Sequence, residues 1–542
     1  MGNPLAHRHH LWARWLLPAC LWLFASAGHA QPAVEPMLDP GLLAMAQQEL
    51  PAVLETLREL TSVDSGTGQA AGLGAVVAQV ERFAKGLGAE VERVTPANNV
   101  AGPNVVVTFK GTGQRKIMLM SHMDTVYVAG TAASRPLRID GNRAIAPGIA
   151  DDKGGIAVFL HAMKLLKARG FQDFERVTMV FTSDEERGSS GSRDLIRTRA
   201  QQHDMVLNGE PTGPQEAIVL ATSGVGQLSA RLRVGGPFAA ADERPIEELA
   251  DLILRSRNAE QQVPASRMNW TIARAHDPAG LDRLPAADFQ FATLSFRLKG
   301  KASHAGVSPS LGVNAVVEMA ALVRRTTDAA AQLPGARLHW RTVSGGLVGN
   351  VIPDQAMAVA EIALPKGADS ALALEALSRR GTQPLLAGSE ISVHATPGLL
   401  PRSSGAAEAF ATADQRVPDP AAFAVLGQVA RQLIGQQKFP SSQITVQGGL
   451  GFPAYNASEE GKRLAEMARA IYARLGGKLE LLPRTYGGTD AVWAAQSGKP
   501  VVEGMGLPGG NYHSSEEEFV LIDRIPQRLA LVAEMIRALA RR

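Results

Sequence analysis

The chain has 542 residues, of which 45% are hydrophobic and 20% charged, and its formal net charge is +3. This length suits two to four domains, and this composition excludes a collagen, a coiled coil and a largely disordered chain. Because the basic residues are spread along the chain and almost balanced by acidic ones, the sequence predicts no nucleic-acid partner.

The first thirty residues have the pattern of a secretory signal peptide. Arg8 and Arg14 precede an apolar run from Trp15 to Ala27, and small residues follow it. The run is short for a membrane span, so we expect a signal peptide over residues 1–30, no membrane attachment after its cleavage, and a periplasmic or secreted protein. The single cysteine, Cys20, falls inside this segment. Any metal ion in the mature chain must therefore be held by His, Asp and Glu.

The folded part begins with a helical pattern from Gly41 to Leu60. Short apolar runs rich in β-branched residues then alternate with helical segments. Apolar strands without clean alternation, separated by helices, are typical of an α/β sheet covered on both faces. The strand-like runs cover residues 105–109, 116–120, 177–181, 205–207 and 500–504, and further helices are predicted over 156–168, 459–475 and 526–540.

Residues 223–449 interrupt this pattern and contain an internal duplication. The helical stretch Glu248–Arg255 matches Glu318–Arg325, and a tryptophan follows each stretch at the same distance. Two further pairs of strand-like segments match in the same order, which favours two similar α/β units inserted into one domain. The tryptophans are Trp270 and Trp340, and the paired segments are 228–232 with 294–298 and 389–393 with 442–446.

Side chains that can hold metal ions follow several of the predicted strands. In an α/β sheet, functional groups gather at the carboxyl ends of the strands. Imidazole and carboxylate ligands together suit zinc, and two bridged ions can polarise a carbonyl and activate a water. That water needs a base that is not itself a ligand. The residues after strand-like runs are His122, Glu185, Glu186, Glu210 and His513, and Asp151 lies in a glycine-rich turn before a helix.

Five motifs resemble those of the co-catalytic zinc family of aminoacylases, dipeptidases and glutamate carboxypeptidases, with the greatest likeness to bacterial carboxypeptidase G-type enzymes. The resemblance covers nearly all of the mature chain except the duplicated part. It implies an α/β catalytic domain with a mainly parallel central sheet, in two parts (31–222 and 450–542). An α+β lid domain with an antiparallel sheet and helices, duplicated here, interrupts it at 223–449. The motifs are Ser121–Val126, Gly148–Gly155, Asp184–Ser189, Ala302–Gly306 and Gly487–Ala491.

The resemblance also implies that each chain binds two Zn²⁺ ions, and it implies which residues are their ligands. Asp151 would bridge both ions, with His122 and Glu210 on one ion and Glu186 and His513 on the other.

Further residues take their roles from the same resemblance. Glu185 would be the general base, and Asp124 would hold the ring of His122. His304 would stabilise the tetrahedral oxyanion, a task for which dimeric relatives donate the histidine from the partner subunit. The residues implied to contact substrate are Asn350, Gly488 and Thr489.

Only one of the two lid units carries the histidine and the asparagine. In the other unit, Pro237-Phe238 replaces Ser303-His304, and Asp282 falls where Asn350 would. A chain with both copies can close the dimer-like interface internally, so we expect a monomer with His304 supplied in cis.

The predicted activity is zinc-dependent hydrolysis of an amide bond next to a C-terminal carboxylate, in a small peptide or an N-acyl amino acid. A monomeric dipeptidase or an N-acyl-amino-acid amidohydrolase is the alternative, and an inactive binding protein is disfavoured by the intact ligands and Glu185. Carboxylate recognition calls for arginine. None occurs in the expected lid strand at 361–364 or near 449–451, which leaves Arg297, Arg402 and Arg484 as candidates.

Overall fold

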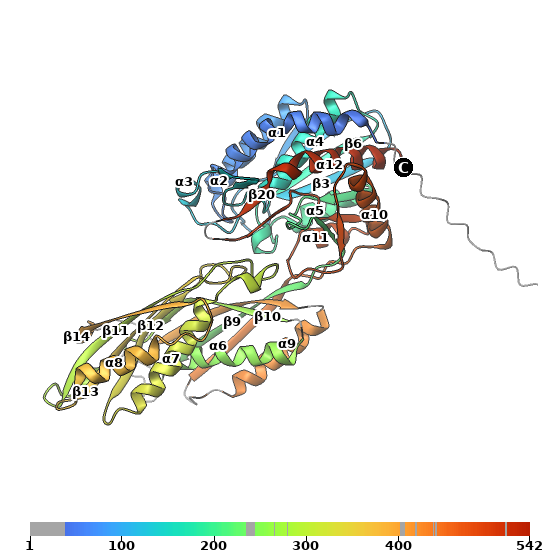
Figure 1. Cartoon of the computed structure of the whole chain (residues 1–542). Helices are drawn as coiled ribbons and strands as arrows, with labels where there is room; N and C mark the ends of the chain where they lie inside the picture. The colour runs from blue at the N-terminus through green and yellow to red at the C-terminus, as the bar shows by residue number, and fades with distance from the viewer. Residues whose placement is uncertain are drawn as a thin grey trace, which may run out of the picture. The chain divides into compact units, whose positions relative to one another are not determined.

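The computed structural model describes residues 38–234, 244–264, 266–278, 280–401, 407–417, 420–436, 438, 442–514 and 517–542. The predicted signal peptide lies outside the described residues. Within them, the strands form two eight-stranded sheets and one four-stranded sheet (Figure 1). The four-stranded sheet consists of β19 (Gly509–Gly510), β20 (Phe519–Leu521), β5 (Arg143–Ile145) and β4 (Arg138–Asp140).

The first eight-stranded sheet takes strands from both ends of the described chain. Its order is β1-β2-β6-β3-β7-β18-β8-β17, and the four central strands β6-β3-β7-β18 are parallel. The mainly parallel central sheet predicted from the sequence is therefore confirmed. The strands are β1 (Glu90–Val94), β2 (Asn104–Lys110), β3 (Lys116–His122), β6 (Arg176–Thr182), β7 (Met205–Asn208), β8 (Ala217–Val219), β17 (Glu480–Leu482) and β18 (Val501–Glu503).

Helices cover both faces of this sheet because its central strands are apolar on both sides. Ile117 and Leu119 of β3 belong to one buried core, whereas Met118 and Met120 belong to another. Figure 1 shows α1, α4 and α12 over one face. The first core includes α1 (Pro40–Thr61), α2 (Ala70–Gly86), α4 (Lys153–Ala168), α10 (Glu459–Arg474) and α12 (Ile525–Ala540), and the second includes α5 (Arg193–Gln201) and α11 (Ala491–Ala495).

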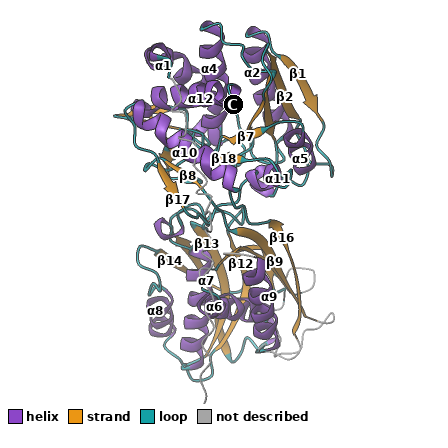
Figure 2. Ribbon diagram, turned by 90° about the vertical axis from the view of Figure 1, so that its right-hand side faces the viewer, coloured by secondary structure: helices purple, strands orange, loops and turns teal. Residues whose placement is uncertain are grey.

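The second eight-stranded sheet and its helices occupy residues 224–452, which we call the lid. Its order is β14-β11-β13-β12-β10-β15-β9-β16, and every pairing of these described strands is antiparallel. Figure 2 shows α6, α7, α8 and α9 packed on one face of this sheet. The elements are β9 (Gly224–Val234), α6 (Pro245–Gln262), β10 (Arg267–His276), β11 (Phe289–Lys299), α7 (Ala315–Ala331), β12 (Arg337–Gly345), β13 (Gln355–Pro365), α8 (Ser370–Gly381), β14 (Glu390–Pro397), β15 (Glu408–Val417), α9 (Pro420–Gly435) and β16 (Ser442–Phe452).

The lid contains two copies of one unit, and one copy is nested in the other. The outer unit is β9-α6-β10-β15-α9-β16, and the inner unit, β11-α7-β12-β13-α8-β14, is inserted between β10 and β15. Read outward from the middle of the sheet, the two halves have equivalent orders, β10-β15-β9-β16 and β12-β13-β11-β14. The segments that match in the sequence all fall on equivalent elements of the two units.

The two units also share a buried contact between helix and strand. In each unit, a fully buried helical glutamate pairs with an arginine seven residues further along the same helix. The same carboxylate accepts a backbone N–H from the segment before the last strand, which ties the helix to the edge of the sheet. The contacts are Glu248 with Arg255 and the N–H of Lys438 in the outer unit, and Glu318 with Arg325 and the N–H of Leu385 in the inner unit.

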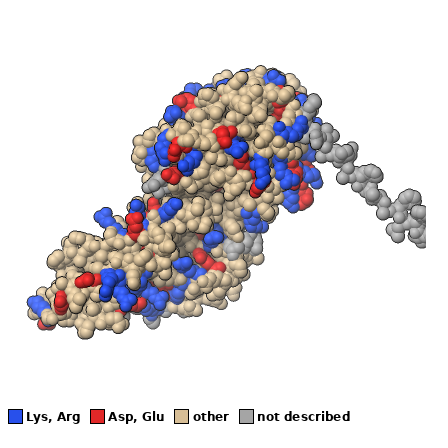
Figure 3. Space-filling model, viewed as in Figure 1, with Lys and Arg blue, Asp and Glu red and all other residues tan. Residues whose placement is uncertain are grey.

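The surface carries mixed charge. On the face shown in Figure 3, Lys and Arg are interspersed with Asp and Glu. In the part of the chain that the structure describes, no helix has both the length and the apolar character needed to cross a membrane.

Candidate active site

Side chains from several loops meet at the carboxyl edge of the first sheet. His122 ends β3, Glu186 lies in the short helix η1 (Glu185–Arg187) after β6, and Glu210 follows β7. Because β6, β3 and β7 are parallel neighbours, their carboxyl ends lie at one edge. Asp151 joins them from the loop before α4, and His513 from the turn after β19. The structure thus brings together all five predicted ligands, which we call the ligand cluster.

The ligand cluster divides into two groups that share Asp151. On one side, His122 Nε2 lies 3.0 Å from Asp151 Oδ1 and 3.9 Å from Glu210 Oε1. On the other, His513 Nε2 lies 3.2 Å from Asp151 Oδ2 and 3.2 Å from Glu186 Oε1. The two oxygens of one carboxylate therefore face two separate pairs of imidazole and carboxylate, which is the donor arrangement of a bridged two-metal site.

Two buried atoms in the second group support this assignment. Glu186 Oε1 and His513 Nε2 have no hydrogen-bond partner among the described residues. Buried polar atoms are nearly always hydrogen-bonded, so this facing pair marks a place for a cation. In the first group, His122, Asp151 and Glu210 each offer a ligand atom, and these atoms lie within 4.8 Å of one another. The residues present therefore fit two metal ions.

The protonation equilibria of the cluster follow from burial and close opposite charges. Burial raises the pKa values of Glu186 and Glu210. Burial alone would lower the pKa values of His122 and His513, but the carboxylates around them raise both well above the usual value. Burial would likewise raise the pKa of Asp151, but the two imidazoles hold it far below its usual range. Carboxylates this close together are costly to ionise, and divalent cations bound between them would stabilise their charged forms.

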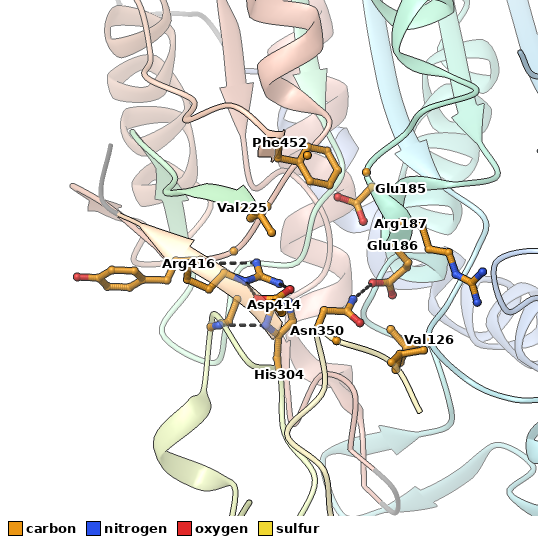
Figure 4. A pocket seen from close by; sticks show the side chains of 18 of the residues that line it. Val126, Glu185, Glu186, Arg187, Val225, His304, Asn350, Asp414, Arg416 and Phe452 are labelled. Atoms are coloured by element: carbon orange, nitrogen blue, oxygen red, sulfur yellow. Dashed lines mark hydrogen bonds and ion pairs between the residues drawn. The ribbon is translucent and has the colours of Figure 1, made fainter. Parts of the chain in front are cut away.

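Glu185 lies beside the cluster and lines the cavity in front of it (Figure 4). Burial, together with the nearby carboxylates of Asp490 and Glu186, raises its pKa well above the usual value. Its backbone N–H donates to Asp124 Oδ1 at 3.1 Å, and that of Glu186 donates to Asp124 Oδ2 at 3.2 Å. Asp124 Oδ1 also lies 3.4 Å from His122 Nδ1. Asp124 thus orients both the imidazole, whose Nδ1 lies 3.0 Å from its carbonyl oxygen, and the turn that carries Glu185.

Glu518 is a supporting residue that sequence reasoning missed. Its carboxylate accepts backbone N–H bonds from Gly148, Ala150 and Asp151 at 2.9–3.1 Å, and the hydroxyl of Tyr127 at 2.6 Å. Burial raises its pKa to about 7. Glu518 therefore fixes the loop that presents Asp151, but it lies in an acidic run of the sequence, a pattern more typical of a solvated surface.

Two residues of the inner lid unit reach the ligand cluster. Asn350 Nδ2 donates to Glu186 Oε2 at 2.8 Å, and the Asn350 carbonyl oxygen lies 3.4 Å from His513 Nδ1. The ring of His304 stacks on that of His513, with centroids 4.3 Å apart. His304 Nδ1 accepts two backbone N–H bonds from its own loop, and burial lowers its pKa well below the usual value. The ring is therefore neutral, and its proton is on Nε2.

Arg416 of β15 is the cavity arginine that sequence reasoning missed. It is buried, and its fork donates to Asp414 at 2.6 and 2.9 Å and to the carbonyl of Tyr486 at 3.2 Å (Figure 4). The strand at 361–364, where the sequence leads one to expect the arginine, is β13 of the inner unit. Strand register equates Ala363 of that strand with Arg416 of the outer unit. An alignment of β13 with β15, the third strands of the two units, would have pointed to Arg416.

The other residues predicted to contact substrate differ in whether they line the cavity. Gly488 and Arg484 line the cavity, whereas Arg297 does not, and Arg402 lies outside the described residues. The hydroxyl of Thr489 is buried behind the cavity wall, where it is bonded to Asn208 and Glu503.

Three residues of the outer unit correspond in the sequence to site residues of the inner unit. Asp282 does not line the cavity, and Pro237-Phe238 lie outside the described part of the chain.

Comparison with known sequences gives a consistent result. The profile of Peptidase family M20/M25/M40 matches residues 118–538. Carboxypeptidase G2 of Pseudomonas sp. (strain RS-16) is 34% identical over 515 residues, which is 95% of this chain and 95% of the relative. Acetylornithine deacetylase of Myxococcus xanthus is 32% identical over 170 residues, 30% of this chain and 43% of the relative.

Solved structures show the same fold at low sequence identity. Human carnosine dipeptidase 1 superposes with a TM-score of 0.55 at 13% identity, covering 92% of this chain and 99% of that one. The metallo-carboxypeptidase Sso-CP2 of Sulfolobus solfataricus gives 0.51 at 15% identity, covering 90% and 99%.

Proposed function

The chain belongs to Peptidase family M20/M25/M40, and from this membership we propose that it is a two-metal hydrolase that cuts the amide bond next to a free C-terminal carboxylate. The observation that carries the proposal is the ligand cluster, in which Asp151 faces two imidazole–carboxylate pairs and two buried atoms have no hydrogen-bond partner among the described residues. The relationship to carboxypeptidase G2 supports the carboxypeptidase type of cleavage.

The proposed ligands are the five residues of the cluster. His122 and Glu210 would hold one ion, Glu186 and His513 the other, and Asp151 both. Two Zn²⁺ ions held there would polarise the scissile carbonyl and lower the pKa of the attacking water.

Glu185 is the proposed proton carrier. It takes a proton from the water as the new C–O bond forms, and gives it to the amide nitrogen as the C–N bond breaks. Its raised pKa suits this double task, because the carboxylate must be basic enough to accept the proton and the resulting carboxylic acid must be acidic enough to release it.

The lid supplies the remaining groups. His304 Nε2–H donates to the oxygen that becomes negative in the tetrahedral intermediate. Arg416 binds the substrate carboxylate through the N–H groups that Asp414 does not occupy, and Asp414 keeps the guanidinium oriented. Asn350 holds Glu186 in place and, with Gly488, borders the bound substrate.

The domain boundaries and the export of the enzyme also form part of the proposal. The proposed domains are those expected from the sequence, a catalytic domain in two parts, 31–222 and 450–542, around an inserted domain at 223–449, except that strand β16 of the lid continues to Phe452. The pattern of residues 1–30 supports export to the periplasm or the medium. N-terminal sequencing of the secreted protein would test that assignment.

The Glu185→Gln variant tests the mechanism. It keeps the size of the side chain but cannot carry the proton, so hydrolysis should fall by about 10²- to 10⁴-fold while two metal ions per chain remain bound. The matched control is Glu466→Gln, at an exposed glutamate of α10, which should leave activity unchanged. Full activity of Glu185→Gln would refute the assignment.

A substrate panel separates the candidate activities. Aminoacyl-glutamates, dipeptides and N-acyl amino acids are compared on the purified enzyme with and without a chelator. Hydrolysis that the chelator abolishes, and that requires a free C-terminal carboxylate, supports the proposal. Equal cleavage of C-terminally amidated substrates would contradict it.

A further inference from the structure

The cavity in front of the ligand cluster extends beyond it across the lid. Its volume is about 1440 Å³, whereas pockets for small ligands are typically ~300–1,000 Å³. It is lined by side chains of four lid strands that are separate from the ligands. Those that define the extension are Gln227 and Ser229 of β9, Thr271 of β10, Phe410 and Thr412 of β15, and Gln447 of β16.

Strand register places four of these polar side chains in one row. Thr271 pairs with Thr412, Thr412 with Ser229, and Ser229 with Gln447. Paired residues on neighbouring strands are ~4.8 Å apart, so the row crosses four strands over ~15 Å. Hydroxyl and carboxamide groups both donate and accept hydrogen bonds, as the amide groups of a peptide-like chain require.

Among the described residues, the row lies on the face of the sheet opposite the one that α6, α7, α8 and α9 cover. Alternate residues of a strand point to opposite faces. Ala411 and Ala413 of β15 are fully buried in the lid core, whereas Phe410 and Thr412 are half-buried and line the cavity. The polar face is therefore not used for packing the lid.

Residues of β15 connect this face to the proposed carboxylate site. Phe410, Thr412, Asp414 and Arg416 share one face, and six residues of strand span ~20 Å. At the far end, the guanidinium of Arg231 lies over the ring of Phe410, 5.3 Å from its centroid. The surface thus begins at Arg416, crosses the polar row and ends at this aromatic–cation pair.

We propose that this surface is an extended subsite for the remote part of a long, peptide-like substrate. The inference rests on the proposed function and deepens it: the enzyme prefers amide-containing chains longer than a dipeptide. The polar row bonds the amide groups of the chain, and the Phe410–Arg231 pair contacts its end.

A series of peptides with the same C-terminal residue and the same scissile bond, lengthened on the acyl side, tests the subsite. In the wild type, kcat/KM should rise with length in this series. Thr412→Val keeps the shape of the side chain but removes its hydroxyl, and should lower the ratio of kcat/KM for long over short substrates by about 3- to 10-fold, mainly through KM.

The matched control is Met357→Ala. Met357 occupies, in the inner unit, the position equivalent to Phe410, and it does not line the cavity. Met357→Ala should leave the ratio unchanged, whereas Phe410→Ala should lower it. An absence of length preference in the acyl-side series, or an unchanged ratio in both subsite variants, would overturn the subsite.

Calorimetry with the Glu185→Gln protein separates this proposal from the proposed function. Binding of the same peptides to that variant does not depend on hydrolysis. If the affinity of the Glu185→Gln protein rises with peptide length, and adding Thr412→Val to it lowers that affinity, the subsite stands even where the assigned mechanism fails. Affinity that is independent of length would reject the subsite even where hydrolysis is confirmed.

Discussion

Asn350 of the lid donates a hydrogen bond of 2.8 Å to Glu186 of the ligand cluster. The loop that carries Asn350 is itself held by the other lid unit. Asn269 Nδ2 of β10 donates to the carbonyl oxygens of Gly349 at 2.6 Å and Val351 at 2.7 Å. A residue of the outer unit therefore fixes the inner-unit loop on both sides of Asn350.

Replacing Asn269 by alanine should lower kcat by about 10-fold with a smaller change in KM. Two carbonyls lose their donor, so the loop can shift, and a displacement of ~1 Å near reacting groups can cost ~100-fold in rate. Steady-state kinetics measure the effect, and thermal unfolding reports any loss of stability.

His339 provides the matched control for Asn269. It occupies the equivalent position in the inner unit, directly before Trp340, as Asn269 directly precedes Trp270. His339→Ala should destabilise the lid without lowering kcat. Equal losses of kcat in both variants would show that Asn269 acts only through lid stability.

Local patterns were sufficient to predict the first sheet and the neighbourhood of the ligands. The runs at 116–120 and 177–181 are apolar on both faces, which only a covered sheet allows, and both are observed as neighbouring parallel strands. Because parallel strands end at the same edge, the side chains that follow them had to lie close together.

Contacts between distant segments could not be predicted. Nothing near Glu518 in the sequence indicates that it accepts three backbone N–H bonds from the loop before α4. Arg416 was missed for a related reason: the inner unit separates β15 from β9 and β10, the first two strands of its own repeat. A nested duplication places equivalent strands far apart in the chain.

The Arg416→Lys variant should lose carboxylate recognition. Lysine keeps a positive charge beside Asp414 but cannot present two parallel N–H groups. Losing a charged hydrogen bond should lower kcat/KM for substrates with a free carboxylate by about 10- to 100-fold.

C-terminally amidated substrates provide the control for Arg416. The wild type should discriminate strongly against them, and Arg416→Lys should discriminate much less. If the variant rejects the amides as strongly as the wild type does, another residue binds the carboxylate, and Arg484 is the next candidate in the cavity.

His304 should act within its own chain. Its ring stacks on His513 of the same chain, so no partner subunit is needed to complete the site. We expect a monomer in light scattering. A mixture of the His304→Ala and Glu185→Gln variants should stay as inactive as either alone, because each chain lacks one essential group. Recovery of activity on mixing would show that the histidine is donated between subunits.

Stability should fall as the pH drops from about 6.5 to 4, in part because of His161. This histidine is 1% exposed, with Nδ1 2.7 Å from Glu49 of α1 and Nε2 2.9 Å from Thr56. Burial lowers its pKa to about 4, and this outweighs the opposite influence of Glu49, while Lys164 on the same helix adds to the lowering.

The sign of the effect follows from which state binds the proton. Between pH 6.5 and 4 the unfolded chain protonates this histidine and the folded chain does not, so stability is complete above pH 6.5 and decreases towards pH 4, by at most about 3 kcal/mol. In His161→Gln that loss disappears, and its melting temperature should therefore approach that of the wild type as the pH falls. Phe83→Leu, at the ring that packs 4.8 Å from His161, should instead lower the melting temperature by a similar amount at every pH. A difference between the wild type and His161→Gln that stays constant from pH 7 to pH 4 would show that His161 does not titrate in this range.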